Sequence, residues 1–147
     1  MAYRFSYQKI LDVKQIQEDQ ISTEVVLARN KLNKEKDTLS ELEDKKSKAL
    51  NDEKAKTENS ADLLRHNSYV KQVNQTIEKQ KKQIQKKDEM LSSKKDELLE
   101  ASKSRKILDK LKESDLKKYN LEQNRKEQKE IDEIGAKIAH NKKEKKS

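Results

Sequence analysis

The sequence has no cysteine, no proline and no tryptophan, and it has one glycine and one phenylalanine in 147 residues. Without cysteine, the chain can form neither a disulfide framework nor a cysteine-based metal site. Average usage would give a chain of this length about 7 prolines and 10 glycines, so helix breakers are nearly absent. Disordered segments are usually rich in both residues. We therefore expect long helices rather than disorder.

Apolar residues are scarce as well, at 30% of the chain, whereas 44% of the residues are charged. This composition cannot fill a globular core of ordinary thickness. The 36 Lys and Arg residues and the 28 Asp and Glu residues are interspersed and leave a net charge of +8. Such a surface is solvated and attracts anionic partners only weakly.

The longest apolar run, residues 25–28, is far shorter than the stretch of about 20 residues that spans a bilayer. We therefore expect no membrane insertion. The first twenty residues carry six charged side chains, so we expect no signal-peptide core. The sequence thus predicts a cytoplasmic protein.

Two stretches show the alternating spacing of three and four residues that is typical of a coiled-coil heptad. The first consists of Ile21, Val25, Ala28, Leu32, Glu35, Leu39 and Leu42, with Glu35 as its one polar member. The second repeats every seven residues at Val70, Ile77, Ile84, Leu91 and Leu98. Its companion positions are weaker: Val73, Gln80, Lys87, Lys94 and Ala101. This narrow, half-polar seam predicts a two-stranded coiled coil of modest stability.

Between the two seams, residues 57–62 are polar and include Asn, Ser and Asp, which favour bends. We expect an all-α fold in which two long helices form an antiparallel coiled-coil hairpin, monomeric on its own. Helix 1 would span about 3–58, the bend about 59–62, helix 2 about 63–141, and a frayed basic tail 142–147, in a single unit of residues 1–147. One continuous helix paired with a second chain is the alternative, because no Gly or Pro marks the bend.

A fold-back near residue 61 would place Leu32 opposite Leu91, and Leu11 opposite Leu111. Because helix 1 would begin near residue 3, helix 2 would have no partner after Tyr119. The C-terminal part of helix 2 is therefore predicted to overhang.

The predicted overhang has two distinct faces at helical spacing. One face is apolar: Ile131, Ile134 and Ile138. The opposite face is polar: Arg125, Gln128, Lys129 and Asp132. An isolated helix is only marginally stable in water, so an apolar stripe without a partner in the chain predicts a partner outside it.

No catalytic or cofactor-binding pattern is visible. His66 and His140 are far apart in the sequence, no nucleophile has a His partner, and no Gly-rich phosphate loop exists. We expect no enzyme, no metal and no cofactor. A basic patch at residues 79–87 and the basic tail could attract phosphates, but stacking aromatics are nearly absent, so nucleic-acid binding is not favoured.

Both ends of the sequence resemble those of the bacterial flagellar export family FliJ. The N-terminal stretch FSYQKILDVKQIQED provides the aromatic and Gln-Lys-Ile-Leu pattern, in Phe5, Gln8, Lys9, Ile10 and Leu11. Tyr7 stands where Leu is commoner. The C-terminal stretch YNLEQNRKEQKEIDEI provides the more specific motif, in Glu122, Arg125, Glu127, Gln128, Lys129, Asp132 and Glu133. The segment SYVKQVNQTIEKQ is similar to the start of helix two in this family.

The resemblance implies a non-enzymatic part in flagellar type III protein export. Family members are stalk-like coiled coils that insert into the hexameric export ATPase FliI, contact the export gate FlhA and handle export chaperones at the cytoplasmic face of the membrane. It implies an ATPase-binding site made of Glu122, Arg125, Gln128, Lys129, Asp132 and Glu133. It also implies an export-gate contact near Val73 and Ile77.

Two other classes of function stay open at this point. One is a structural or scaffolding coiled coil, including the stalk of another secretion system or of a V-type rotary ATPase. The other is a nucleic-acid binder. The ordered motif between residues 122 and 133 favours the export stalk, because a general scaffold does not need it.

Overall fold

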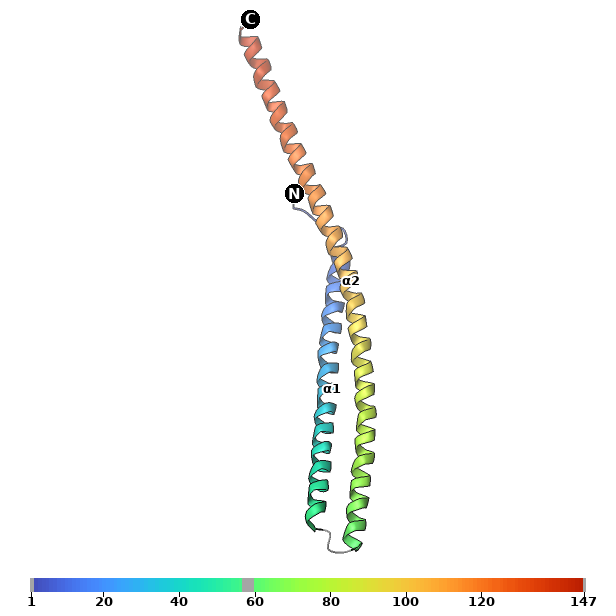
Figure 1. Cartoon of the computed structure of the whole chain (residues 1–147). Helices are drawn as coiled ribbons and strands as arrows, with labels where there is room; N and C mark the ends of the chain where they lie inside the picture. The colour runs from blue at the N-terminus through green and yellow to red at the C-terminus, as the bar shows by residue number, and fades with distance from the viewer. Residues whose placement is uncertain (1, 57–59, 147) are drawn as a thin grey trace. The chain divides into compact units, whose positions relative to one another are not determined.

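The computed structural model describes residues 2–56 and 60–146, which form two long helices (Figure 1). Helix α1 spans Gln8–Lys56 and helix α2 spans Ser60–Lys146, and the described residues contain no strand. The chain groups into two compact units, unit 1 (Met1–Ile16 with Ser102–Ser147) and unit 2 (Gln17–Ala101). The predicted all-α fold of two packed helices is confirmed. The expectation of a single unit stays a prediction.

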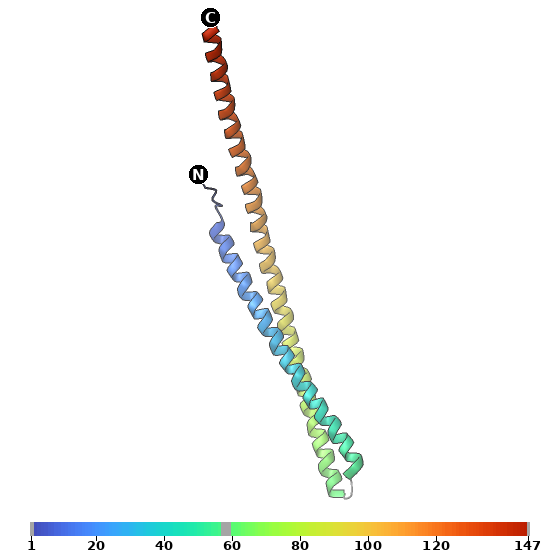
Figure 2. The same ribbon diagram turned by 90° about the vertical axis from the view of Figure 1, so that its left-hand side faces the viewer.

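In unit 2, α1 and α2 lie side by side (Figures 1 and 2). Their contact contains a buried apolar cluster of Val25, Leu32 and Leu91, with Ala28, Ile84 and Leu98 packed against it. All six residues stand at predicted seam positions, because the alternating spacing brings them to one side of each helix. No described side chain is completely enclosed. The core is therefore a single thin seam, as the sequence predicts.

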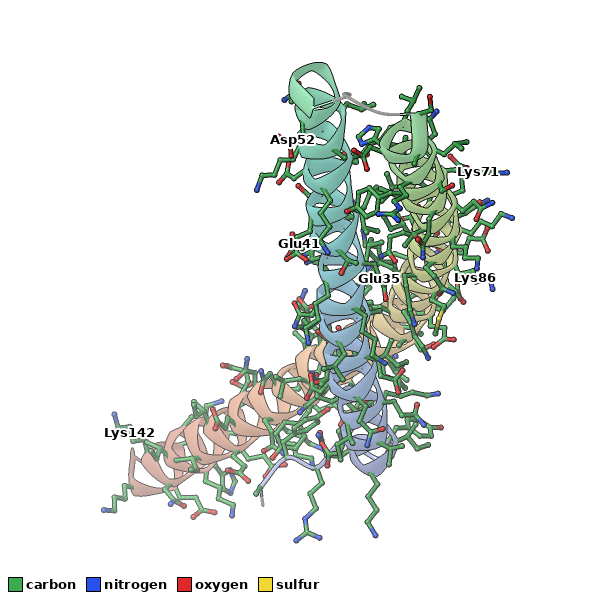
Figure 3. The ribbon with its side chains drawn as sticks, turned by 90° about the horizontal axis from the view of Figure 1, so that it is seen from below. Glu35, Glu41, Asp52, Lys71, Lys86 and Lys142 are labelled. Atoms are coloured by element: carbon green, nitrogen blue, oxygen red, sulfur yellow. The ribbon has the colours of Figure 1, made fainter. Side chains whose placement is uncertain are left out.

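The polar member of the first seam finds a polar partner. Glu35 lies on the side of α1 that faces α2, whereas Glu41 and Asp52 point away from α2 (Figure 3). The Nε2 atom of Gln80 donates a hydrogen bond of 2.8 Å to the backbone oxygen of Glu35, and another to its carboxylate. These bonds satisfy polar atoms that the helix contact removes from water.

This bond also corrects the predicted register of the two helices. A fold-back near residue 61 implies that Gln80 lies opposite Leu42, but Gln80 bonds to Glu35, one heptad earlier in α1. The helix bounds agree with this shift, because α1 ends at Lys56 and α2 begins at Ser60. A shift of one heptad keeps seam residues facing seam residues, so the spacing alone could not distinguish the two registers.

A second bond links the helices at the edge of the seam. Lys94 Nζ lies 2.9 Å from a carboxylate oxygen of Glu24 on α1 and 3.3 Å from one of Glu97 on its own helix. The hydrogen bond to Glu24 is the main reason why the pKa of Lys94 is raised. All three side chains are partly exposed, so these pairs fix geometry more than they stabilise the fold.

In unit 1, the N-terminal segment packs before the helix starts. We expected helix 1 to begin near Tyr3, but α1 begins at Gln8, whose N–H donates a bond of 3.1 Å to the backbone oxygen of Phe5. Phe5 and Leu11 are buried. The Tyr3 hydroxyl donates a bond of 2.9 Å to Asp115 Oδ2 on α2. The non-helical backbone thus lets Tyr3 reach the side of α2.

The predicted pairing of Leu11 with Leu111 is wrong. Leu111 is 45% exposed, and the neighbouring Lys112 is the half-buried residue at the seam. A lysine can occupy such a position because its aliphatic stem covers apolar surface while its ammonium group stays in water.

The start and the end of α2 also differ from expectation. Of the bend expected at 59–62, residue 59 lies outside the described residues, and residues 60–62 belong to the first turn of α2. The basic tail expected to fray after 141 is helical to Lys146.

Within the described part of the chain, no helix is long and apolar enough to cross a membrane.

Candidate docking surfaces

The C-terminal part of α2 is exposed on all sides. Every side chain of residues 124–145 is exposed, and no other described segment of unit 1 lies beside its last turns (Figures 1 and 2). Its three isoleucines, Ile131, Ile134 and Ile138, are between 52% and 62% exposed. The predicted overhang is therefore present in unit 1, and its apolar stripe faces water.

The opposite face of this segment carries four of the predicted ATPase-binding residues, Arg125, Gln128, Lys129 and Asp132. The other two, Glu122 and Glu133, flank them in the sequence, and all six are exposed. The structure brings two of them together, since Gln128 Nε2 donates a hydrogen bond of 3.1 Å to Asp132 Oδ1. This pair is spaced i, i+4, the spacing at which an amide and a carboxylate are neighbours on a helix surface. The face presents both donors and acceptors to a partner.

Gly135 interrupts neither face. Its backbone is helical, and a Cβ atom added there would meet nothing within 4 Å. Glycine in a helix interior costs about 1 kcal/mol relative to alanine, so the isolated segment is a less stable helix than it would be with alanine at this position.

The predicted export-gate residues occupy a different environment. Val73 and Ile77 are 7% and 6% exposed, at seam positions of α2 in unit 2. Tyr69, four residues before Val73 and directly before the seam residue Val70, is exposed at the edge of the helix contact. A partner that stays outside the hairpin would therefore touch the surface around Val73 and Ile77 rather than these two side chains.

Sequence reasoning missed a cluster at the N-terminus. The rings of Tyr3 and Tyr119 pack with their centroids 5.3 Å apart, next to the bond from Tyr3 to Asp115. Loss of solvation, and then the bond to Asp115, raise the pKa of Tyr3. The sequence signal was the fold-back near residue 61, which placed residue 3 opposite Tyr119 but did not predict a cluster there. This cluster attaches the N-terminal segment just before the exposed segment of α2 begins.

The family model described as "Flagellar FliJ protein" matches residues 3–144. The chain belongs to the flagellar FliJ family. It is therefore a component of the flagellar export apparatus, in a family that is non-catalytic. No curated protein and no solved structure is similar enough to this chain to count as a match.

The FliJ match covers both ends that carry the sequence resemblance. Within the described residues, no group of three or more His, Asp or Glu side chains is arranged to hold a metal ion. His140 Nε2 lies 3.1 Å from a carboxylate oxygen of Glu144, four residues later on the same exposed helix. His66 is half-buried in unit 2.

Proposed function

We propose that this FliJ-family chain is the stalk of the export ATPase. In this proposal, the exposed segment of residues 124–145 inserts into the hexameric ATPase FliI and promotes its assembly and activity. The chain also contacts the export gate FlhA, handles export chaperones and works at the cytoplasmic face of the membrane. The observation that carries the proposal is the long exposed helical segment with an apolar stripe and an ordered polar face.

Physical chemistry supports a docking role for this segment. Complete burial of one isoleucine is worth about 1.5–3 kcal/mol, so Ile131, Ile134 and Ile138 have much to gain from a partner surface. On the other face, Arg125, Lys129 and Asp132 can form charge-assisted hydrogen bonds, which are about twice as strong as neutral ones. A segment with both kinds of contact can be surrounded by the subunits of a ring.

The proposed gate contact centres on Val73 and Ile77. Because both side chains are buried, we propose that the gate binds the outer surface of this part of α2, whose shape they support from within. An opening of the seam that exposes both side chains would also serve. The two forms differ in whether exposed neighbours such as Tyr69 contribute to binding.

The stalk proposal is tested by replacing Gln128 and Asp132 with Ala in the full chain. Both are exposed, so helix content and melting should stay unchanged, since surface substitutions usually shift stability by less than about 0.5 kcal/mol. Stimulation of ATP hydrolysis by purified FliI should fall several-fold. Glu41→Ala with Lys45→Ala, an equally exposed pair on α1, is the matched control. Undiminished stimulation by the Gln128 and Asp132 variant would refute the proposed role of this face.

A further inference from the structure

Unit 1 carries a second apolar surface, formed by both helices before the exposed segment begins. It consists of Ile10, Val13, Ile107 and Leu111, each between 45% and 67% exposed. We call these four residues the Ile10 face. None of them takes part in the seam or in the proposed ATPase contact.

The seam places these residues on one side of the helix pair. Ile10 directly precedes the buried seam residue Leu11, and Leu111 directly precedes the half-buried seam residue Lys112. In an antiparallel pair, residues that directly precede equivalent seam positions lie on the same side.

The other two residues widen the same surface. Val13 and Ile107 are three and four residues from Ile10 and Leu111, and such residues are neighbours on a helix. The bond from Tyr3 to Asp115 places the start of the chain beside this part of α2. Because the helices are antiparallel, the first turns of α1 then run beside the turns of α2 that precede Lys112.

In unit 1, the charged side chains nearest to the Ile10 face are basic. Lys9 neighbours Val13, Lys103 and Lys110 neighbour Ile107, and Lys118 follows Leu111 two turns later, all of them exposed. In the packed turns of unit 1, the acidic residues stand at the seam or on the other side of the pair: Asp12, Asp109, Glu113 and Asp115. The face is thus an aliphatic surface with a lysine rim.

We propose that the Ile10 face binds an amphipathic helix of a partner protein whose apolar stripe is flanked by Asp and Glu. The apolar surface shared by two helices is where a third helix packs in a bundle, and such grooves bind amphipathic helices. The lysine rim selects acidic flanks and opposes a second copy of this chain, because two copies would bring their lysines together. The proposal is independent of the ATPase contact, since none of its four residues belongs to the exposed segment of residues 124–145, and its test contains no ATPase.

The test measures binding of a synthetic probe to the full-length chain by fluorescence anisotropy. The probe is an amphipathic helix of about five turns, with Leu at i, i+3, i+4 and i+7 and Glu on both flanks. A second peptide has each Glu replaced by Lys. We expect binding of the acidic peptide only. Ile107→Ser with Leu111→Ser should weaken it by about tenfold or more, with helix content unchanged because both residues are exposed. Ile16→Ser, also exposed in unit 1 but on the back of α1, should leave binding unchanged.

A charge variant separates the rim from the apolar surface. Lys103→Glu with Lys110→Glu should weaken binding of the acidic peptide and strengthen binding of the lysine-flanked peptide. Equal binding of both peptides to the unaltered chain, or equal loss of binding in the Ile16 control, would overturn the proposal.

Vesicles of anionic phospholipid serve as a third probe. Binding to vesicles that depends on Ile107 and Leu111, without binding of the acidic peptide, would assign the face to lipid instead.

Discussion

Leu32→Ala should destabilise the chain far more than the same change at a nearby exposed leucine. Leu32 is 4% exposed and belongs to the buried cluster with Val25 and Leu91. The substitution removes three carbon atoms, each worth about 0.8 kcal/mol when buried, or about 2.4 kcal/mol before any cavity term. With a partial cavity, we expect a loss of about 2–4 kcal/mol in the free energy of unfolding.

The assay is urea unfolding followed by circular dichroism, with Leu27→Ala as the control. Leu27 is on the same helix and 55% exposed, so its substitution should cost less than about 0.5 kcal/mol. For Leu32→Ala, the urea concentration at the midpoint of unfolding should fall, and the dependence of the unfolding free energy on urea concentration should stay the same. Equal, small effects at both positions would show that the cluster is not the element that holds the helices together.

Two further predictions concern the ends of the helix contact. Because the pKa of Tyr3 is raised in the folded chain, its bond to Asp115 contributes fully to stability below the ordinary pKa of about 10, and this contribution is lost as pH rises through the folded-state value. In a thermal-melting series, the melting temperatures of the unaltered chain and of Tyr3→Phe should therefore converge at alkaline pH. A difference between the two melting temperatures that grows with pH would contradict this. Val73→Ala with Ile77→Ala should weaken binding to the cytoplasmic domain of the export gate more than binding to FliI in pull-down assays, with Tyr69→Ala doing the same if the outer surface is what the gate touches. If binding to the gate domain and binding to FliI fall equally, and the hairpin also melts, Val73 and Ile77 serve only to pack the seam.

The sequence predicts the helices and the seam well, for a simple reason. The alternating spacing through Val25 and Leu32, and through Ile84 and Leu91, can be buried only on one side of a helix. The near absence of Gly and Pro leaves no competing structure. The exposed isoleucines of residues 124–145 follow from the same argument, because α1 is too short to cover them.

The register could not be predicted from the spacing. A seam with a seven-residue repeat matches itself after a shift of one heptad, and the bond between Gln80 and Glu35 is a polar detail that apolar spacing does not contain. The position of the bend, which has no Gly or Pro, gave no independent constraint. Leu111 was assigned to the seam because it is apolar, although Lys112 has the correct phase.

The N-terminal segment was mispredicted for a different reason. Residues 3–7 have no helix breaker, yet Tyr3 and Phe5 gain more from contact inside unit 1 than from an added helical turn. Tertiary contacts of this kind override local propensity.

Site-specific photo-crosslinking to the assembled export ATPase tests the stalk proposal most directly. A photoreactive residue at position 136, one turn after Asp132 on the polar face of the exposed segment, is compared with one at position 41 on the outward side of α1 (Figure 3). We predict a crosslinked product with FliI from position 136 that depends on hexamer assembly, and none from position 41. Crosslinking from position 41 alone, or from neither position while the chain still stimulates the ATPase, would contradict insertion of the C-terminal segment into the ring.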